Sequence, residues 1–469
     1  MSSLPLPPVT LPLLPVVPPA VAMRWSALIL AAVTLGCHAQ DRTTEAGEAS
    51  ITDAKAECAP YDYPPLDAQR TAFPPPSKAA DILPNDTTAQ SRWQSIVSSV
   101  PNIPPKPAPG SSGSGGFKYP PGDPDCWWTG TQCVTPKLSG LPPDIADVPE
   151  PSTMGYGFDD GPSCSHNAFY NYLASKNQKA SQSPHVFCTS CRDLVLLAAM
   201  FYIGTNVYNW PLEAQRGLAD GHEICVHTWS HNYMTSLSSS SAFAELYYSK
   251  YQFLILHQSP QMLTPHPQRQ MEIIKLVVGV TPTCWRPPYG DVDDRIRAIA
   301  NGLGLRTILW KYDSFDWKYG SGGTKKAEID ANYQDVINKA SNGSFASAGA
   351  IMLTHELNDF TMSEAMEYHD KLQAVFKYIV PVGVAYNNTQ AYVETNYTLP
   401  TFEQYISGTT TIPPGAQAKL ASPSGSSSGS GGSTSASASP SPTSAAVVTL
   451  PWTHAGKWLL VTFALIVLC

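Results

Sequence analysis

The sequence predicts an α/β domain with a largely parallel sheet or barrel, and two features of the chain support this fold class. Between about residues 136 and 400, short apolar runs alternate with helical stretches, as expected when helices connect parallel strands. Several of the runs end in polar residues, which is where barrel enzymes carry their chemistry. The predicted strands include 156–158, 201–203, 224–226, 307–310 and 350–353.

The length and charge of the chain limit the classes of function. Its 469 residues are enough for one large domain or two smaller ones with flanking segments. The formal net charge is −8 and only 14% of the residues are charged, so we expect no electrostatic nucleic-acid binder.

Residues 1–39 are predicted to be a signal peptide region. Met23-Arg24-Trp25 supplies a positive charge, 26–35 is an apolar core, and Cys37-His38-Ala39 resembles a cleavage site. The Pro-rich stretch before Met23 does not fit such a signal, so we predict that Met23 is the true start.

Residues 40–135 are predicted to be a Pro-rich extension and linker, and therefore a disordered N-terminal flank. Prolines at 104–107 followed by a Ser/Gly run at 111–116 indicate a stiff and then a flexible segment. Cys126 and Cys133 are the best candidates for a disulfide, closing a small loop around Trp127 and Trp128. These tryptophans could form a sugar-stacking surface, but we favour a packed cap on the next domain.

The C-terminal end predicts a membrane attachment. Residues 401–446 include a Ser/Gly/Pro-rich tract that reads as a glycosylated stalk, and 447–469 resembles a GPI-attachment signal that is removed, with Ser444 as the predicted lipidation site. The alternative is a single membrane anchor, but the apolar tail 458–469 is short for a span.

Secretion would make two other features consistent. Four N-x-S/T sequons predict glycosylation along the secretory route, at Asn85, Asn342, Asn387 and Asn396. Of ten cysteines, Cys37 and Cys469 lie in the predicted signals, and an oxidising compartment would let the other eight pair.

His227-Thr228-Trp229-Ser230-His231 follows the apolar run 223–226 and is the centre of the predicted site. Thr228 is a candidate helix N-cap, which would place His231 in the first turn of a helix. Two neutral imidazoles facing one point suit a divalent cation such as zinc. The competing interpretation is two surface histidines.

Adjacent carboxylates end another predicted strand, at Asp159 and Asp160. Because they point in different directions, one can complete a His-His-carboxylate metal site and the other can act as a base. A polar Asp-Gly turn is the alternative.

Three further stretches follow predicted strands or rigid loops. Each alone also reads as a turn, a surface loop or a core histidine. They are Arg286-Pro287-Pro288-Tyr289-Gly290-Asp291, Asp313-Ser314-Phe315-Asp316-Trp317 and Ile351-Met352-Leu353-Thr354-His355.

Together these five stretches resemble, in order, the five motifs of the NodB-type polysaccharide deacetylases. The resemblance covers about residues 136–400, and within the family the chain is most similar to GPI-anchored fungal chitin deacetylases. It implies a distorted (β/α) barrel, a monomer acting on chitin or another N-acetylglucosamine polymer, and a protein secreted and GPI-anchored at the plasma membrane and cell wall.

The family roles, carried over to this sequence, imply a metal site and an acid–base pair. Asp160, His227 and His231 would bind a divalent metal, with Zn²⁺ expected and Co²⁺ or Mn²⁺ as alternatives. Asp159 would be the general base, and His355 would protonate the departing amine.

Other residues would support these groups. Arg286 would hold the base, and Asp316 would orient His355 and favour its charged form. The Tyr289 backbone N–H would stabilise the oxyanion, whereas Trp317 and Leu353 would wall the acetyl pocket.

The chain departs from the family pattern in two ways. Gly157 stands where the family usually has a Thr, a position that does not take part in the predicted reaction. In addition, 181–199 separates a predicted helix at 177–180 from the following strand, and 253–270 interrupts another helix. We interpret both segments as translated introns; the alternative is genuine insertions, such as a lid.

Two other functions remain open at this point. An esterase on acetylated xylan, or a deacetylase of another glycan, would share the metal site. A catalytically inactive wall-binding protein would have no need of a metal together with an acid and a base.

Overall fold

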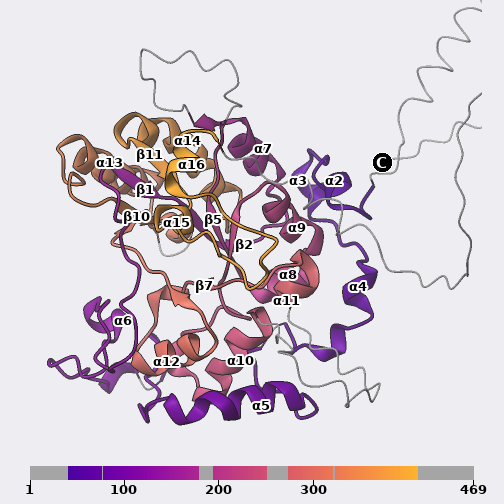
Figure 1. The fold of residues 1–469 in the computed structure, drawn as a ribbon, viewed down its shortest axis with the longest axis vertical. Coiled ribbons are helices and arrows are strands. Elements are labelled where there is room, and N and C mark those ends of the chain that lie inside the picture. The colour runs from indigo at the N-terminus through magenta and orange to yellow at the C-terminus, as the bar shows by residue number, and fades with distance from the viewer. Residues whose placement is uncertain are drawn as a thin grey trace, which may run out of the picture. The chain divides into compact units, whose positions relative to one another are not determined.

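The computed structural model describes residues 41–76, 78–112, 114–178, 194–250, 273–320 and 323–409. From residue 153 onward strands and helices alternate, and the helices lie around the strands (Figure 1). All strand pairs in the two larger sheets are parallel, which requires the helical crossovers seen between them.

One sheet has five strands in the order β2-β5-β6-β7-β8, and the other has four in the order β11-β1-β10-β9. The strands of the first sheet are β2 (Gly157–Gly161), β5 (Ala199–Tyr202), β6 (Glu223–Val226), β7 (Cys284–Trp285) and β8 (Arg306–Thr307). The second sheet contains β1 (Thr153–Gly155), β9 (Tyr312–Asp313), β10 (Ala350–Leu353) and β11 (Tyr378–Val380).

Two stretches of chain take part in both sheets and so close them into a barrel. β1 pairs with β10 and β11, whereas β2, which begins two residues later, pairs with β5. In the same way β8 pairs with β7, and β9 pairs with β10 a few residues further on. A bridge between Asp159 and His355 joins the two sheets again. The predicted α/β fold with a distorted barrel is therefore confirmed.

The barrel helices follow the strands in turn. They are α7 (Asn167–Ser175), α8 (Gly204–Asn209), α9 (Pro211–Ala219), α10 (Ser239–Lys250), α11 (Ile273–Val278), α12 (Asp294–Gly302), α13 (Lys326–Ser341) and α14 (Asp359–Val375), with the short α15 (Val382–Ala385) and α16 (Phe402–Ile406) at the end. Short 3-10 turns are η4 (Met234–Ser236), η5 (Pro288–Gly290) and η6 (Asp316–Lys318). Strands β1, β2, β5, β6 and β10 are buried along their whole length, as parallel strands covered by helices should be.

The predicted strands at 224–226 and 350–353 lie within β6 and β10, and the strand predicted at 201–203 begins earlier, as β5. The strand predicted at 307–310 is shorter than expected, because only Arg306–Thr307 pairs in the first sheet. The chain then leaves that sheet for the second, where the Lys311 N–H donates to the Ile351 carbonyl at 3.4 Å.

The extension predicted as an unpacked linker instead packs against the barrel from residue 41 onward. Its elements are α2 (Glu45–Glu48), α3 (Ala54–Glu57), α4 (Pro64–Asp67), η1 (Arg70–Ala72), α5 (Thr87–Ile96), η2 (Val97–Ser99), η3 (Ser114–Gly116) and α6 (Trp128–Thr131). A disulfide joins Cys58 to Cys164, just beyond β2. Lys106, in the predicted linker, forms buried ion pairs with Asp125 and Asp293 at 2.9 and 2.5 Å. These contacts join residues far apart in sequence, which no local pattern can show.

Part of the first suspected intron belongs to the barrel. Asn177 and Gln178, predicted to be helical, instead form β3 (Asn177–Gln178), because α7 ends at Ser175 and β3 pairs with β4 (Leu194–Val195). The rest of that predicted helix, 179–180, lies outside the described residues. Leu197 is buried, and its N–H donates to the Tyr405 hydroxyl at 2.8 Å. The intron hypothesis is therefore wrong for residues 194–199, which lead into β5. Residues 181–193 and the whole segment 253–270 lie outside the described residues.

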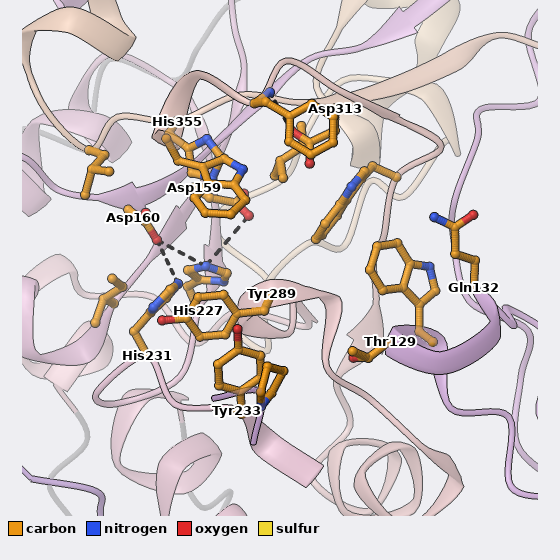
Figure 2. Close-up of a pocket in the computed structure, with 18 of the residues that line it drawn as sticks. Thr129, Gln132, Asp159, Asp160, His227, His231, Tyr233, Tyr289, Asp313 and His355 are labelled. Carbon is orange, nitrogen blue, oxygen red and sulfur yellow. Dashed lines mark hydrogen bonds and ion pairs between the residues drawn. The ribbon is translucent and has the colours of Figure 1, made fainter. Parts of the chain in front are cut away.

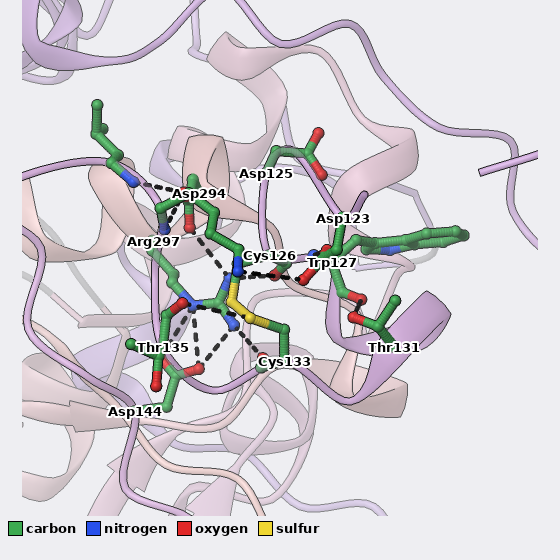
Figure 3. Close-up of a disulfide and its surroundings, with 12 residues drawn as sticks. Asp123, Asp125, Cys126, Trp127, Thr131, Cys133, Thr135, Asp144, Asp294 and Arg297 are labelled. Atoms are coloured by element: carbon green, nitrogen blue, oxygen red, sulfur yellow. Dashed lines mark hydrogen bonds and ion pairs between the residues drawn. A yellow bond between two sulfur atoms is a disulfide. The ribbon is translucent and has the colours of Figure 1, made fainter. Parts of the chain in front are cut away.

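The predicted disulfide between Cys126 and Cys133 is confirmed (Figure 3), and a further one joins Cys225 to Cys284. All four predicted glycosylation residues are exposed, although their modification stays a prediction. Among the described helices, none has the length and apolar character to cross a membrane. The predicted signal region 1–39, most of the stalk, Ser444 and the segment 447–469 lie outside the described residues.

Candidate active site

The five predicted stretches meet at one cavity, at the carboxyl ends of β2, β6, β7, β9 and β10. The cavity has a volume of about 780 Å³. Figure 2 shows Asp159, Asp160, His227, His231 and His355 around it, together with Tyr289. Its lining is Pro109, Trp128, Thr129, Gln132, Asp159, Asp160, Ile203, Asn206, His227, His231, Tyr233, Tyr289, Trp310, Lys311, Asp313, Phe315, Trp317, Leu353, His355 and Leu357.

Asp160, His227 and His231 form a group that could hold a metal ion. Each offers one ligand atom, and the three atoms lie within 4.8 Å of one another. Asp160 Oδ1 is 3.1 Å from His231 Nε2 and 3.4 Å from His227 Nε2. The sequence predicted this set, and the structure brings it together.

The protonation pattern of the group fits a cation. His227 Nδ1 lies 2.7 Å from the Arg286 carbonyl oxygen, which can only accept, so Nδ1 carries the hydrogen and Nε2 has a free lone pair. Asp160 Oδ1 is buried and has no hydrogen-bond partner within the described part of the chain. A lone pair and an unpaired carboxylate oxygen facing each other are what a divalent metal satisfies.

Asp160 is held in its charged form. Burial raises the pKa of this carboxyl, but the charge of His231 and the close approach of both imidazole rings outweigh it and lower the pKa well below its usual value. An ionised, buried carboxylate needs a cationic partner, which a bound metal would supply.

Five residues of the motif stretches have left-handed backbones that are rare outside glycine. These are Asp160 (φ 70°), Thr228 (φ 65°), His231 (φ 57°), Tyr289 (φ 59°) and Phe315 (φ 55°). Each such residue costs on the order of 1–3 kcal/mol, and such strain gathers where side chains must be aimed. Strain at four of the five motif stretches therefore supports their functional role.

The predicted helix start at Thr228 is wrong. Thr228 Oγ1 does accept from the His231 N–H at 3.1 Å, as a cap would, but no helix follows until η4 and α10. Glu245 in α10 accepts from the N–H groups of Trp229 and Ser230 at 3.0 and 2.8 Å. Because this distant carboxylate binds those N–H groups, the segment forms a tight loop that turns His231 toward Asp160.

Asp159 is positioned as a base with one oxygen occupied. Arg286 Nη1 donates to Asp159 Oδ1 at 2.6 Å, and both side chains are buried. The guanidinium lies over the ring of Phe201 at 3.9 Å, which fixes its plane. The other oxygen, Oδ2, lies 3.7 Å from His227 Nε2 and is free to accept a proton.

His355 is positioned as an acid. Its Nδ1 lies 2.6 Å from Asp316 Oδ1, and its backbone N–H donates to Oδ2 of the same carboxylate at 3.0 Å. Burial lowers the pKa of His355, but the charge and hydrogen bond of Asp316, together with the charges of Asp160 and Asp159, raise it to about 10. The ring is therefore protonated at neutral pH.

The three predicted substrate-binding residues, Tyr289, Trp317 and Leu353, all line the cavity. Tyr289 stacks on Tyr233 with ring centres 4.0 Å apart and meets the His231 ring at 4.7 Å. Trp317 is partly exposed, whereas Leu353 is buried. The predicted residues therefore lie together in one cavity, which contains both titratable and apolar side chains.

Several lining residues were not assigned to the site from the sequence. Tyr233 lies two residues beyond His231, a spacing that could have indicated it. Asp313 also lines the cavity. Its burial raises its pKa to about 6, although a hydrogen bond from the Phe315 N–H partly opposes this rise. Trp128 and Gln132 come from the extension. The packed cap favoured from the sequence fits the buried Trp127, whereas Trp128 lines the cavity, and no pattern in the sequence pointed to Gln132.

Comparisons with known proteins agree with this site. The family model for polysaccharide deacetylases matches residues 192–308. "Chitin deacetylase 2" of Cryptococcus neoformans var. grubii is 46% identical over 374 residues, which cover 79% of this chain and 74% of that protein. "Chitin deacetylase" of Amylomyces rouxii is 43% identical over 272 residues, covering 58% of this chain and 55% of that protein. The structure of the chitin deacetylase from Colletotrichum lindemuthianum covers 52% of this chain and 92% of its own, with a TM-score of 0.38 and 20% identity.

Proposed function

This chain belongs to the polysaccharide deacetylase family, and on that premise we propose that it hydrolyses the N-acetyl groups of N-acetylglucosamine units in chitin, giving chitosan and acetate. The observation that carries the proposal is the arrangement around one cavity of a base, an acid and a metal-binding group: Asp159, His355 and the set Asp160, His227 and His231.

The proposed metal-binding group offers only oxygen and nitrogen ligands and no thiolate. Such a group suits Zn²⁺, with Co²⁺ or Mn²⁺ as alternatives. When bound, the metal supplies Lewis-acid polarisation of the acetyl carbonyl. A hydrogen bond behind His227 supports the same role, because the Arg286 carbonyl fixes which nitrogen of His227 faces the site.

The proton transfers follow from the two carboxylate–cation pairs. Asp159 Oδ2 accepts a proton from water as the water adds to the carbonyl carbon, while Arg286 keeps Oδ1 in place. His355 then donates a proton from Nε2 to the amide nitrogen as the C–N bond breaks, leaving acetate and a free amine. Its other hydrogen stays on Nδ1 and is donated to Asp316 Oδ1 throughout.

Apolar side chains would position the acetyl group. We assign Trp317 and Leu353, which both line the cavity, to the walls of the acetyl pocket. We assign the Tyr289 backbone N–H to the oxyanion, as the family resemblance implies; Tyr289 lines the cavity at a left-handed position.

We also propose that the protein is secreted, glycosylated at the four sequons and attached through Ser444 to a GPI anchor, so that a monomeric enzyme works at the cell wall. The exposure of all four asparagines supports the glycosylation part of the proposal. The three disulfides of the described residues support an oxidising compartment.

The test is acetate release from chitin oligomers, with acetylated xylan as the comparison substrate. We expect release from the chitin oligomers, loss of it after chelation and dialysis, and recovery on adding Zn²⁺ or Co²⁺. The His231→Ala variant serves as the control that added metal should not restore. Full activity of protein shown to be metal-free, or release from xylan alone, would contradict the proposal.

A further inference from the structure

One part of the cavity wall does not come from the barrel. Trp128, Thr129 and Gln132 lie in the loop closed by the disulfide between Cys126 and Cys133, and all three line the cavity. Figure 2 shows Thr129 and Gln132 across the cavity from Asp160 and His231, with Tyr289 between them. This loop lies outside the residues that the family model matches.

The loop is fixed to the motif that carries Tyr289. Asp291 Oδ1 accepts from Trp127 Nε1 and from Thr129 Oγ1, each at 2.8 Å. The Trp128 N–H donates to the Val292 carbonyl at 3.0 Å. Asp291 is buried and also accepts from the Thr235 N–H at 2.8 Å, four residues beyond His231. Hydrogen bonds therefore fix this loop in place as one wall of the cavity.

Arg297 holds the other side of the loop (Figure 3). Its guanidinium donates to the carbonyls of Cys126 and Cys133 at 2.6 and 3.0 Å, and to Asp144 at 2.7 Å. Both ends of the disulfide loop are thus bound to one buried cation in α12. Such a loop keeps its shape when a ligand arrives, which limits the entropy lost on binding.

The Trp128 indole forms an apolar platform. It packs against Trp310 with ring centres 4.8 Å apart, and it lies so close over Gly290 that an added Cβ would be 2.3 Å from the indole. The Trp128 side chain is only partly buried, and it lines the cavity. Trp127 is the buried cap, whereas Trp128 is the cavity-facing ring.

Gln132 adds a polar group at the edge of this platform. It is exposed, sits at a left-handed position (φ 55°), and its amide has no hydrogen-bond partner in the described part of the chain. A glutamine amide offers two donors and one acceptor, which suits the hydroxyl and acetamido groups along the edge of a sugar ring.

We propose that Trp128 and Gln132 form a binding subsite for a sugar unit near the one that is deacetylated, so that the enzyme favours longer oligomers. The inference rests on the proposed function. A flat aromatic ring complements the apolar face of a pyranose, and a polar group beside it fixes orientation. A cavity of about 780 Å³ is in the range of a drug-sized ligand, well beyond an acetyl group.

The test measures affinity against chain length. Chitin oligomers from the dimer to the hexamer are titrated calorimetrically into the metal-loaded Asp159→Asn protein, with and without Trp128→Ala. We expect the gain in affinity with length to fall by about threefold to tenfold in Trp128→Ala. Trp93→Ala is the matched control, because Trp93 lies in the same extension, packs on Phe243 and does not line the cavity.

Gln132→Ala removes the exposed amide without opening a packed contact. We expect it to reduce the same gain by a smaller factor, with the melting temperature unchanged. If the gain with length survives in both variants, or if Trp93→Ala lowers it equally, the subsite is overturned. Acetate release by the wild-type protein reports on the proposed function separately, because the affinity measurement needs no turnover.

Discussion

The barrel and the extension, which each supply one wall of the cavity, both use buried ion pairs, but to different ends. On the barrel side, Arg286 binds one oxygen of Asp159 and leaves the other facing the metal-binding group. On the extension side, Lys106 binds one oxygen each of Asp125 and Asp293, and their other oxygens accept from Tyr119 and from the Ile296 N–H. Where every oxygen of a buried carboxylate is paired, as on the extension side, the ion pair holds two segments of the chain together. Where one oxygen is left unpaired toward the cavity, as in Asp159, the carboxylate can take part in the reaction.

This contrast predicts that changes to the ion pairs on the barrel side remove activity, whereas changes to the ion pairs on the extension side remove stability. The largest effect is expected for Asp159→Asn, which should lower the rate of acetate release about 10²–10⁴-fold because it removes the general base. The metal content, measured by elemental analysis, should stay at the wild-type level.

His231→Ala is the matched variant on the same wall. It should lose both the bound metal and the activity, because it removes one of three ligands. Equal metal loss in the two variants would mean that Asp159 is itself a ligand, and the assignment of roles would be wrong.

The second prediction concerns the extension side. Lys106→Met should lower the free energy of unfolding by about 3–5 kcal/mol, because it leaves two buried carboxylates without their cation. Chemical denaturation measures this. The control is Lys311→Met, whose ion pair with Asp147 is exposed and should be worth at most about 1 kcal/mol. Equal losses in the two variants would remove the distinction between tethering and surface pairs.

The third prediction is a pH dependence on the barrel side. Because the pKa of His355 is raised from 6.5 to about 10, the acid form persists at neutral pH and activity should fall as the pH rises through that value. A bound metal offsets the charges of Asp160 and Asp159, so the fall should lie at or below pH 10. The same shift stabilises the fold fully below pH 6.5, and this contribution is lost as the pH rises through about 10.

Asp316→Asn should move the fall in activity toward the ordinary histidine pKa, because it removes the main charge that raises it. The measurement is the pH profile of kcat/KM for both proteins. An unshifted profile would mean that another group limits activity at high pH.

The two walls also differed in how far the sequence could predict them. On the barrel side the chemistry demands particular residue types, and the alternation of strands and helices determines that Asp159, His227 and His355 share one end of the barrel. The extension depends on pairings such as Cys58 with Cys164, more than a hundred residues apart, and on Lys106 with Asp293. No local period or turn signal encodes such pairings.

The same reason explains the local errors. Thr228 carries a proper capping hydroxyl, but Glu245 in a later helix takes the N–H groups that a helix would have used. Residues 194–199 were interpreted as part of an intron because the strand after them was expected at 201–203, whereas β5 begins at Ala199. Their burial against Tyr405 and His222 becomes visible only when the chain is folded.

The smallest effect on the cavity is expected from the tail. Truncation after about Gly425 should leave kcat/KM unchanged, because every lining residue lies before residue 358. If the GPI proposal is right, the truncated protein should appear in the medium instead of at the membrane. A second truncation, after Thr401, separates the tail from the fold: it removes Phe402 and Tyr405, both buried, and should destabilise by roughly 3–5 kcal/mol per ring. Assay of the cell fraction and the medium distinguishes the cases. Membrane retention of the first truncated protein would contradict the anchor, whereas loss of its activity would mean that residues beyond 425 contribute to the cavity after all.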